Sequence, residues 1–159
     1  MGFRPHYTKV MALRTVWLFL VLAASGLAQS APVTLAVHVL APCPAHGSGQ
    51  PIKLPGVDSS LCLDGAPFLT EKDVQSAEIH KNSQGRPLVF LTFHEVAAVR
   101  EMEITRKNIG NRVGIVLNGR TVAAPSIPGA SRFLYIDGNY TEKQALDLVT
   151  AFNKLAGNR

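Results

Sequence analysis

Charged residues are scarce in this sequence, and their shortage excludes a nucleic-acid-binding protein. They make up 17% of 159 residues, with 16 Lys and Arg against 11 Asp and Glu. Three of the bases (Arg4, Lys9 and Arg14) lie in the first 28 residues, which contain no acid, so the remaining chain carries 13 bases against 11 acids. A nucleic-acid partner would require a larger, clustered basic surplus. The hydrophobic content of 47% is that of a chain that folds around a core.

Catalytic and metal-binding motifs are missing as well. His94-Glu95 begins an HExxH zinc motif, but Ala98 stands where the second histidine is required. No glycine-rich loop has the spacing of a phosphate-binding motif, and no serine has that of a hydrolase nucleophile. Carboxylates that could form an acid–base pair lack supporting spacing and are interpreted as solvated: Glu71, Glu78, Glu101 and Glu103. We therefore expect no catalytic residue, no metal and no cofactor.

The first 28 residues have the pattern of an export signal. Basic residues precede an apolar run over 16–24, and the small residues Gly26 and Ala28 follow it. These two fit the −3 and −1 positions of signal peptidase, which predicts cleavage before Gln29. Cleavage after Ser30 is the near alternative. We expect an exported protein of the bacterial periplasm that has no stable membrane insertion after cleavage.

Two alternatives for this segment stay open. Translation could start at Met11 and not at Met1, and a start at Met11 gives a segment closer to the usual pattern of an export signal. An uncleaved signal would leave the protein associated with the membrane, because the uncharged run over 15–31 has about 17 residues, the lower limit for a spanning helix.

The only two cysteines, Cys43 and Cys62, both follow the predicted cleavage site. In an oxidising compartment an even pair indicates a disulfide. Closing a loop of this size would stabilise the fold by about 3 kcal/mol in the chain-entropy model. Two free thiols, or a bond to another chain, remain alternatives. Neither cysteine belongs to a CxxC motif, so the sequence gives no support for a redox function.

The chain after the signal divides into segments that differ in amino-acid composition. Residues 29–60 are rich in proline and glycine and contain one apolar alternation, over 33–39, that predicts a strand. Residues 61–156 form a more regular body, and 157–159 are a short tail. The first half of the body is predicted to contain a short helix capped by Thr70, strands over 77–81 and 87–94, and a helix over 95–107. A hairpin of 113–117 and 120–124 around Asn118-Gly119 and a strand over 133–136 are expected to follow. The last predicted element is a helix that begins at a Thr141 capping box. The expected fold class is α+β, a mostly antiparallel β-sheet with two main helices packed on one face.

Five short motifs follow one another along this body. They are Leu69-Thr70-Glu71-Lys72-Asp73-Val74, Leu91-Thr92-Phe93, Glu103-Ile104-Thr105-Arg106-Lys107-Asn108-Ile109-Gly110, Asn118-Gly119-Arg120-Thr121-Val122-Ala123-Ala124-Pro125 and Gly138-Asn139-Tyr140-Thr141. In this order they resemble the head subdomain of the first periplasmic region of the protein translocase subunits SecD and SecDF. The resemblance covers about residues 61–156.

The resemblance implies a periplasmic module of the protein-export machinery, whose head contacts preprotein as it emerges from the channel. Its partners would be polypeptide or an envelope protein, with the Sec translocon among them. Energy in that family comes from protons that cross the membrane part. Because this sequence contains no transmembrane bundle after the signal, we expect a free-standing, exported head and not a motor. The family supplies no catalytic residues.

The leading hypothesis is therefore a non-enzymatic binding module that holds a polypeptide or an envelope protein against a sheet edge or an apolar groove. The candidate binding residues lie at the end of the predicted hairpin, in the loop after it or in the next strand, where the chain is more apolar than a solvated turn: Ala123, Ala124, Pro125, Ile127 and Tyr135. These residues could instead simply pack against the helices. The sequence gives no oligomeric state.

Two further hypotheses come from other classes. One is an envelope enzyme, or an inhibitor of one, with an unrecognised site that uses His94, Glu95 and Tyr135; the absence of a spaced nucleophile, base or metal set counts against it. The other is an accessory subunit that docks on a membrane complex.

Overall fold

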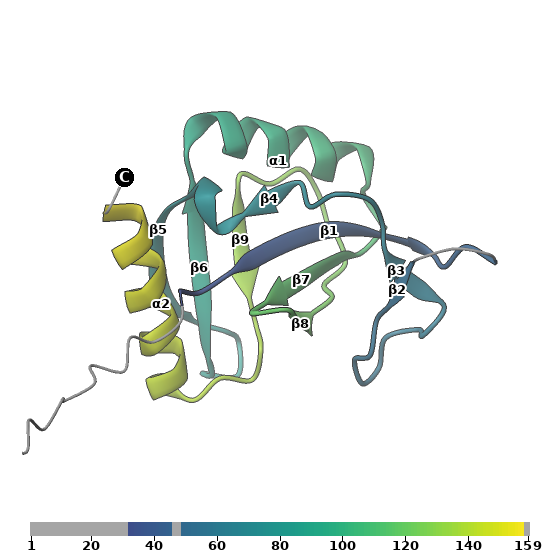
Figure 1. The fold of residues 1–159 in the computed structure, drawn as a ribbon. Coiled ribbons are helices and arrows are strands. Elements are labelled where there is room, and N and C mark those ends of the chain that lie inside the picture. The colour runs from purple at the N-terminus through teal and green to yellow at the C-terminus, as the bar shows by residue number, and fades with distance from the viewer. Residues whose placement is uncertain (1–31, 46–48, 158–159) are drawn as a thin grey trace, which may run out of the picture. The chain divides into compact units, whose positions relative to one another are not determined.

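The computed structural model describes residues 32–45 and 49–157 (Figure 1). The predicted export signal, both starts and both alternative cleavage sites lie outside these residues. Within the described ranges, no helix combines the length and the apolar character that a membrane crossing requires.

Along the chain, groups of strands precede each of the two long helices. They are β1 (Leu35–Pro42), β2 (Gln50–Pro51), β3 (Leu61–Leu63), β4 (Leu69–Thr70), the 3-10 turn η1 (Glu71–Asp73), β5 (Val74–Lys81), β6 (Pro87–Phe93), α1 (Glu95–Lys107), β7 (Val113–Leu117), β8 (Arg120–Ala123), β9 (Phe133–Ile136) and α2 (Glu142–Gly157). The helix predicted over 95–107 is confirmed in both bounds, whereas β5 begins at Val74, three residues before the predicted strand.

The strands form two antiparallel sheets. The six-stranded sheet has the order β2-β3-β1-β7-β8, with β4 also paired to β1, and the three-stranded sheet has the order β5-β6-β9. The expected α+β class, with mostly antiparallel strands and two main helices, is confirmed. The expectation of a single sheet is wrong. The reason is a long-range pairing of β1 with β7, in which Val37 lies opposite Ile115, so that the amino-terminal strand joins the hairpin and not β5 and β6.

One core cluster connects both sheets and both helices. Leu91 of β6 and Ile115 of β7 are fully buried in it, together with Phe152 of α2, and α1 adds the buried Ala98. Burial of each large side chain of this kind contributes about 1.5–3 kcal/mol to folding. Both helices therefore supply the core beneath one face of the three-stranded sheet, as Figure 1 shows for α2 beside β5 and β6.

Local sequence signals account for the hairpin and for α2. Asn118 and Gly119 have positive φ angles of 49° and 75°, which a two-residue turn between right-twisted strands requires, so the predicted hairpin of β7 and β8 is confirmed. The predicted capping box is also present. The Gln144 backbone N–H donates to Thr141 Oγ1 (3.2 Å), and the Thr141 N–H donates to Gln144 Oε1 (2.9 Å).

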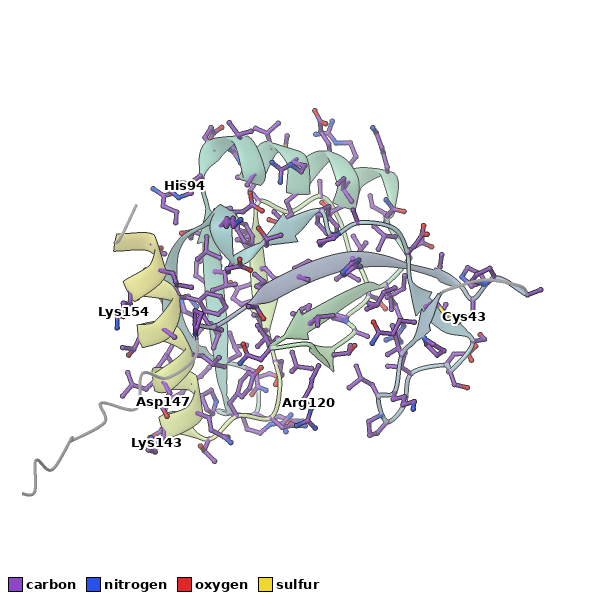
Figure 2. The ribbon with its side chains drawn as sticks, in the orientation of Figure 1. Cys43, His94, Arg120, Lys143, Asp147 and Lys154 are labelled. Carbon is purple, nitrogen blue, oxygen red and sulfur yellow. A yellow bond between two sulfur atoms is a disulfide. The ribbon has the colours of Figure 1, made fainter. Side chains whose placement is uncertain are left out.

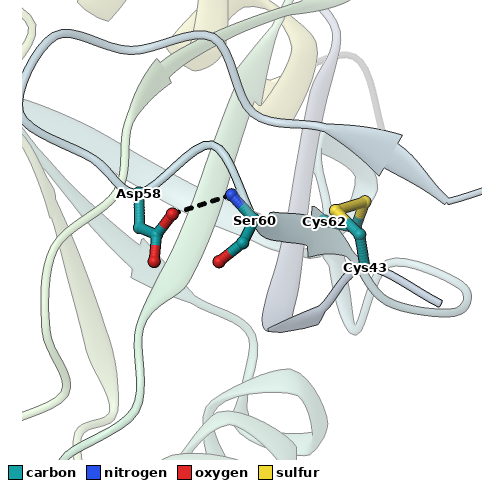
Figure 3. The surroundings of a disulfide bond; sticks show 4 residues. All are labelled: Cys43, Asp58, Ser60 and Cys62. Atoms are coloured by element: carbon teal, nitrogen blue, oxygen red, sulfur yellow. Dashed lines mark hydrogen bonds between the residues drawn. A yellow bond between two sulfur atoms is a disulfide. The ribbon is translucent and has the colours of Figure 1, made fainter. Parts of the chain in front are cut away.

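The proline- and glycine-rich segment packs on the body through β1 and a disulfide. Cys43 follows β1, Cys62 lies in β3, and the two are bonded with their Cα atoms 4.9 Å apart (Figure 3). This confirms the predicted intrachain disulfide over the alternatives. Before β3, the backbone N–H of Ser60 donates to the Asp58 carboxylate (2.8 Å; Figure 3), and this hydrogen bond lowers the pKa of Asp58.

Candidate functional site

A groove lies between the outer edges of β8 and β9. In the described part of the chain, β8 pairs only with β7 and β9 only with β6. A first cavity of about 440 Å³ is bordered by β9, α1 and the loop over 125–131, and a second of about 540 Å³ by β8 and β9. The two cavities share Pro125 and Tyr135, and together we call them the edge groove. Both volumes fall in the range of about 300–1,000 Å³ that ligand-binding sites occupy.

The edge groove contains all five residues that the sequence indicates as a binding site. Pro125, Ile127 and Tyr135 line the first cavity, and Ala123, Ala124, Pro125 and Tyr135 line the second. Their exposure differs. Ile127 and Ala124 are buried and belong to the floor of the groove, whereas Tyr135 is 44% exposed. Packing therefore explains part of this set, and Tyr135 is the member that presents a large side chain to solvent.

An aromatic cluster lies beside the groove on the outer face of the three-stranded sheet. The ring of Tyr135 is 4.9 Å from that of Phe90, 5.4 Å from Phe133 and 6.0 Å from the imidazole of His80, measured between centroids. Phe133 is 43% exposed and also lines the first cavity. Sequence reasoning missed this cluster, because its members meet only through the pairing of β6 with β9, which sets Phe90 opposite Tyr135.

Glu101 on α1 is the charged group of the first cavity. Its side chain was expected to be solvated, but the residue is only 2% exposed, and its Oε2 atom has no hydrogen-bond partner among the described residues. Burial raises the pKa of Glu101 to about 7. The expectation fails because α1 turns Glu101 to the same side as the buried Ala97, Ala98 and Thr105. Their spacing of three and four residues from Glu101 was the signal that could have revealed it.

The other three carboxylates differ from Glu101. Glu78 and Glu103 are exposed, as expected. Glu71 is half-buried, and its Oε2 accepts a hydrogen bond from the backbone N–H of Leu35 (3.1 Å), so it has a structural contact and is not simply solvated.

The three residues of the enzyme hypothesis, His94, Glu95 and Tyr135, have different surroundings in the structure. His94 is exposed at the start of α1 (Figure 2), and its side chain forms no capping hydrogen bond. The Glu95 carboxylate accepts a hydrogen bond from the Arg132 guanidinium (2.5 Å), and Tyr135 packs in the aromatic cluster. Over residues 32–45 and 49–157, no group of three or more His, Cys, Asp or Glu side chains is arranged to hold a metal ion.

Comparison with known proteins gives matches to one family. The family model described as SecDF, P1 head subdomain, matches residues 51–156, more than half of the chain. Protein translocase subunit SecDF of Thermus thermophilus is 46% identical over 63 residues, which cover 40% of this chain and 9% of that protein. Protein translocase subunit SecD of Aquifex aeolicus is 34% identical over 87 residues, which cover 54% of this chain and 17% of that protein. The chain thus spans less than a fifth of the length of these relatives.

Two solved structures resemble the fold. The structure reported as that of a membrane component SecDF that enhances protein export has a TM-score of 0.57 at 26% sequence identity, over 76% of this chain and 62% of that chain. The crystal structure of SecDF in the super-membrane-facing form has a TM-score of 0.58 at 26% identity, over 76% of this chain and 18% of that chain. Both share the α+β arrangement described above.

Proposed function

The chain belongs to the SecDF P1 head subdomain family, and from this premise we propose that it is an exported binding module that holds an extended segment of polypeptide in the edge groove. The family is a component of protein translocation and not an enzyme. A head-like domain of this kind therefore acts through binding. The partner, the binding site and the compartment are proposed from features of this chain.

The observation that carries the proposal is the pair of strand edges at one groove. An unpaired edge presents backbone N–H and C=O groups that can pair with another chain. In strand addition these backbone hydrogen bonds provide affinity for any extended sequence, while pockets beside the edge select side chains. The edge groove has both features, since its second cavity lies between β8 and β9 and its first cavity lies beside β9.

The side chains around the groove suit an unfolded partner. Exposed Phe133 and Tyr135 offer large rings at low entropic cost, and Pro125 and Ile127 supply aliphatic surface at their side. Such surface favours apolar side chains, which an unfolded polypeptide exposes and a folded one buries. The Sec translocon and exported preproteins are the partners we propose, and the periplasm is the compartment.

Site-specific crosslinking in cells tests this function. A photoreactive phenylalanine analogue replaces Tyr135 in the groove, and in a matched control it replaces Leu146, which is 55% exposed on α2. The proposal predicts that position 135 crosslinks to extended segments of many exported polypeptides, identified by mass spectrometry, and that position 146 does not. The same products from both positions, or none from position 135, would contradict it.

A second candidate is an accessory subunit that docks on a membrane complex. The aromatic cluster of His80, Phe90, Phe133 and Tyr135 favours it. Two of its rings, Phe133 and Tyr135, are exposed, and exposed aromatic rings are typical of protein interfaces. In the same crosslinking experiment, this candidate predicts one dominant membrane-protein product from position 135, in place of many polypeptides.

A further inference from the structure

The first cavity of the edge groove has a mostly apolar lining that contains one carboxyl group. Its lining comes mainly from aliphatic and aromatic side chains and the loop over 125–131, and Glu101 is the only residue of the lining with a charged side chain. Two hydroxyl groups of the lining, those of Thr105 and Ser131, already form hydrogen bonds. Thr105 Oγ1 donates to the Glu101 backbone carbonyl (2.8 Å) and accepts from the Ser131 N–H (2.9 Å), and Ser131 Oγ donates to the carbonyl of Phe133 (2.6 Å).

No cation of the described chain neutralises this carboxylate. The cavity faces of β1, β7 and the loop over 125–131 carry only uncharged residues, and Tyr135 is the other titratable group of the lining. Arg100, the preceding residue on α1, donates to the Phe68 carbonyl (3.0 Å) and pairs with Asp73 (3.3 Å). A buried carboxylate oxygen without a donor is costly, and a ligand that supplies one relieves the cost.

We propose, building on the polypeptide-binding function above, that the first cavity receives a basic side chain, lysine or arginine, of the bound polypeptide and pairs its cation with Glu101. Both side chains carry an aliphatic stem that packs on apolar surface and a charged end that reaches a polar group. The stem would lie against Ile127 and Phe133. The charged end would donate to the Glu101 carboxylate, whose buried Oε2 would turn toward the cavity on binding. Charge-assisted hydrogen bonds of this kind are stronger than neutral ones.

The inference includes a direction of pH dependence. A bound cation favours the ionised carboxylate and lowers the pKa of Glu101 from about 7. In the free protein Glu101 is protonated below that pH and offers the cation no charge. Affinity for a basic side chain therefore rises as the pH increases through about 7, while affinity for a neutral analogue does not.

The test uses two short fluorescein-labelled peptides of β-forming residues that differ at one central position, lysine or norleucine. The full chain, recovered in the form that cells produce, is titrated at pH 8 by fluorescence anisotropy. We expect the lysine peptide to bind roughly tenfold or more tightly than the norleucine peptide. Glu101→Gln should reduce this preference to near unity. The matched control Glu103→Gln removes an exposed carboxylate from the same helix and should keep it.

A second measurement does not depend on any variant. The carboxyl carbon of Glu101, followed by NMR, should titrate near pH 7 in the free protein and at lower pH with the lysine peptide bound. Equal binding of the two peptides by the unsubstituted chain, or a preference retained in Glu101→Gln, would overturn the inference and leave the polypeptide-binding function standing. If the folded chain binds neither peptide, both proposals fail.

Discussion

The side-chain amide of Asn153 on α2 forms two hydrogen bonds with the backbone of Ala77 on β5. Asn153 Oδ1 accepts from the Ala77 N–H (2.8 Å), and Asn153 Nδ2 donates to the Ala77 carbonyl (2.9 Å). The amide thus takes the place of a neighbouring strand at one edge of the three-stranded sheet. At the opposite edge, β9 has no such partner strand in the described part of the chain. Of the two edges of this sheet, it is that of β9 that borders the groove.

Replacement of Asn153 by alanine should destabilise the fold by about 1–2 kcal/mol, because both backbone groups of Ala77 lose their partner. Urea denaturation measures the change. Lys154→Ala, an exposed neighbour on α2 (Figure 2), is the control and should change the free energy of unfolding by less than about 0.5 kcal/mol. Equal effects of the two substitutions would show that the amide bridge contributes nothing.

The Cys43–Cys62 disulfide joins residues that are 19 positions apart and should stabilise the fold by about 3 kcal/mol. Thermal unfolding with and without a reductant should therefore show a lower midpoint after reduction. A double variant with serine at both positions should match the reduced protein and should not respond to the reductant. An unchanged midpoint on reduction would contradict this account of the bond.

Gly138 lies against the ring of Tyr140, and a Cβ atom at this position would overlap the ring. Gly138→Ala should therefore destabilise the protein by about 1–3 kcal/mol, the range for overpacking. Gly129→Ala is a matched control, since no atom lies within 4 Å of the added carbon there. Chemical denaturation of the two variants measures the difference, and similar stabilities would show that Tyr140 moves aside without penalty.

The buried carboxyl of Glu101 predicts a pH-dependent stability of defined sign. Its pKa is raised from 4.5 to about 7 on folding, so the folded chain binds its proton more tightly than the unfolded chain does. Stability from this group is present below about pH 4.5 and is lost as the pH rises through 7, a change of up to about 3 kcal/mol. Glu101→Gln removes the titration.

Unfolding free energies of the unsubstituted chain and of Glu101→Gln, measured at pH 5 and pH 8, check this prediction. The variant should gain stability relative to the unsubstituted chain at pH 8. If the difference between the two proteins is the same at both pH values, the carboxyl of Glu101 has an ordinary pKa and the cavity does not isolate it from solvent.

Local signals made part of this molecule predictable from sequence. Asn118-Gly119 encodes its turn in two residues, and Thr141 with Gln144 encodes the start of α2, because each feature depends on atoms a few positions apart. The five groove residues were also found, since an apolar loop after a hairpin is visible in the sequence. Whether they bind a ligand stays a prediction.

The features that escaped prediction depend on contacts between distant segments. The pairing of β1 with β7 results from burial of both strands in one core, and neither strand contains a sequence feature that identifies the other as its partner. The aromatic cluster likewise forms only when β9 pairs with β6. The burial of Glu101 depends on which side of α1 the loop over 125–131 covers. Glu side chains are usually exposed, so the position of a single Glu among apolar residues of a helix does not by itself predict that it is buried.

Hydrogen exchange of backbone amides, with and without a permanently unfolded polypeptide, tests the central claim most directly. Strand addition in the edge groove would pair free backbone groups of β8 and β9 with the ligand. The account predicts slower exchange over residues 120–123 and 133–136 when the reduced and carboxymethylated polypeptide is added, and unchanged exchange in α2. Protection confined to other elements, or no protection of a folded chain at saturating polypeptide, would contradict it.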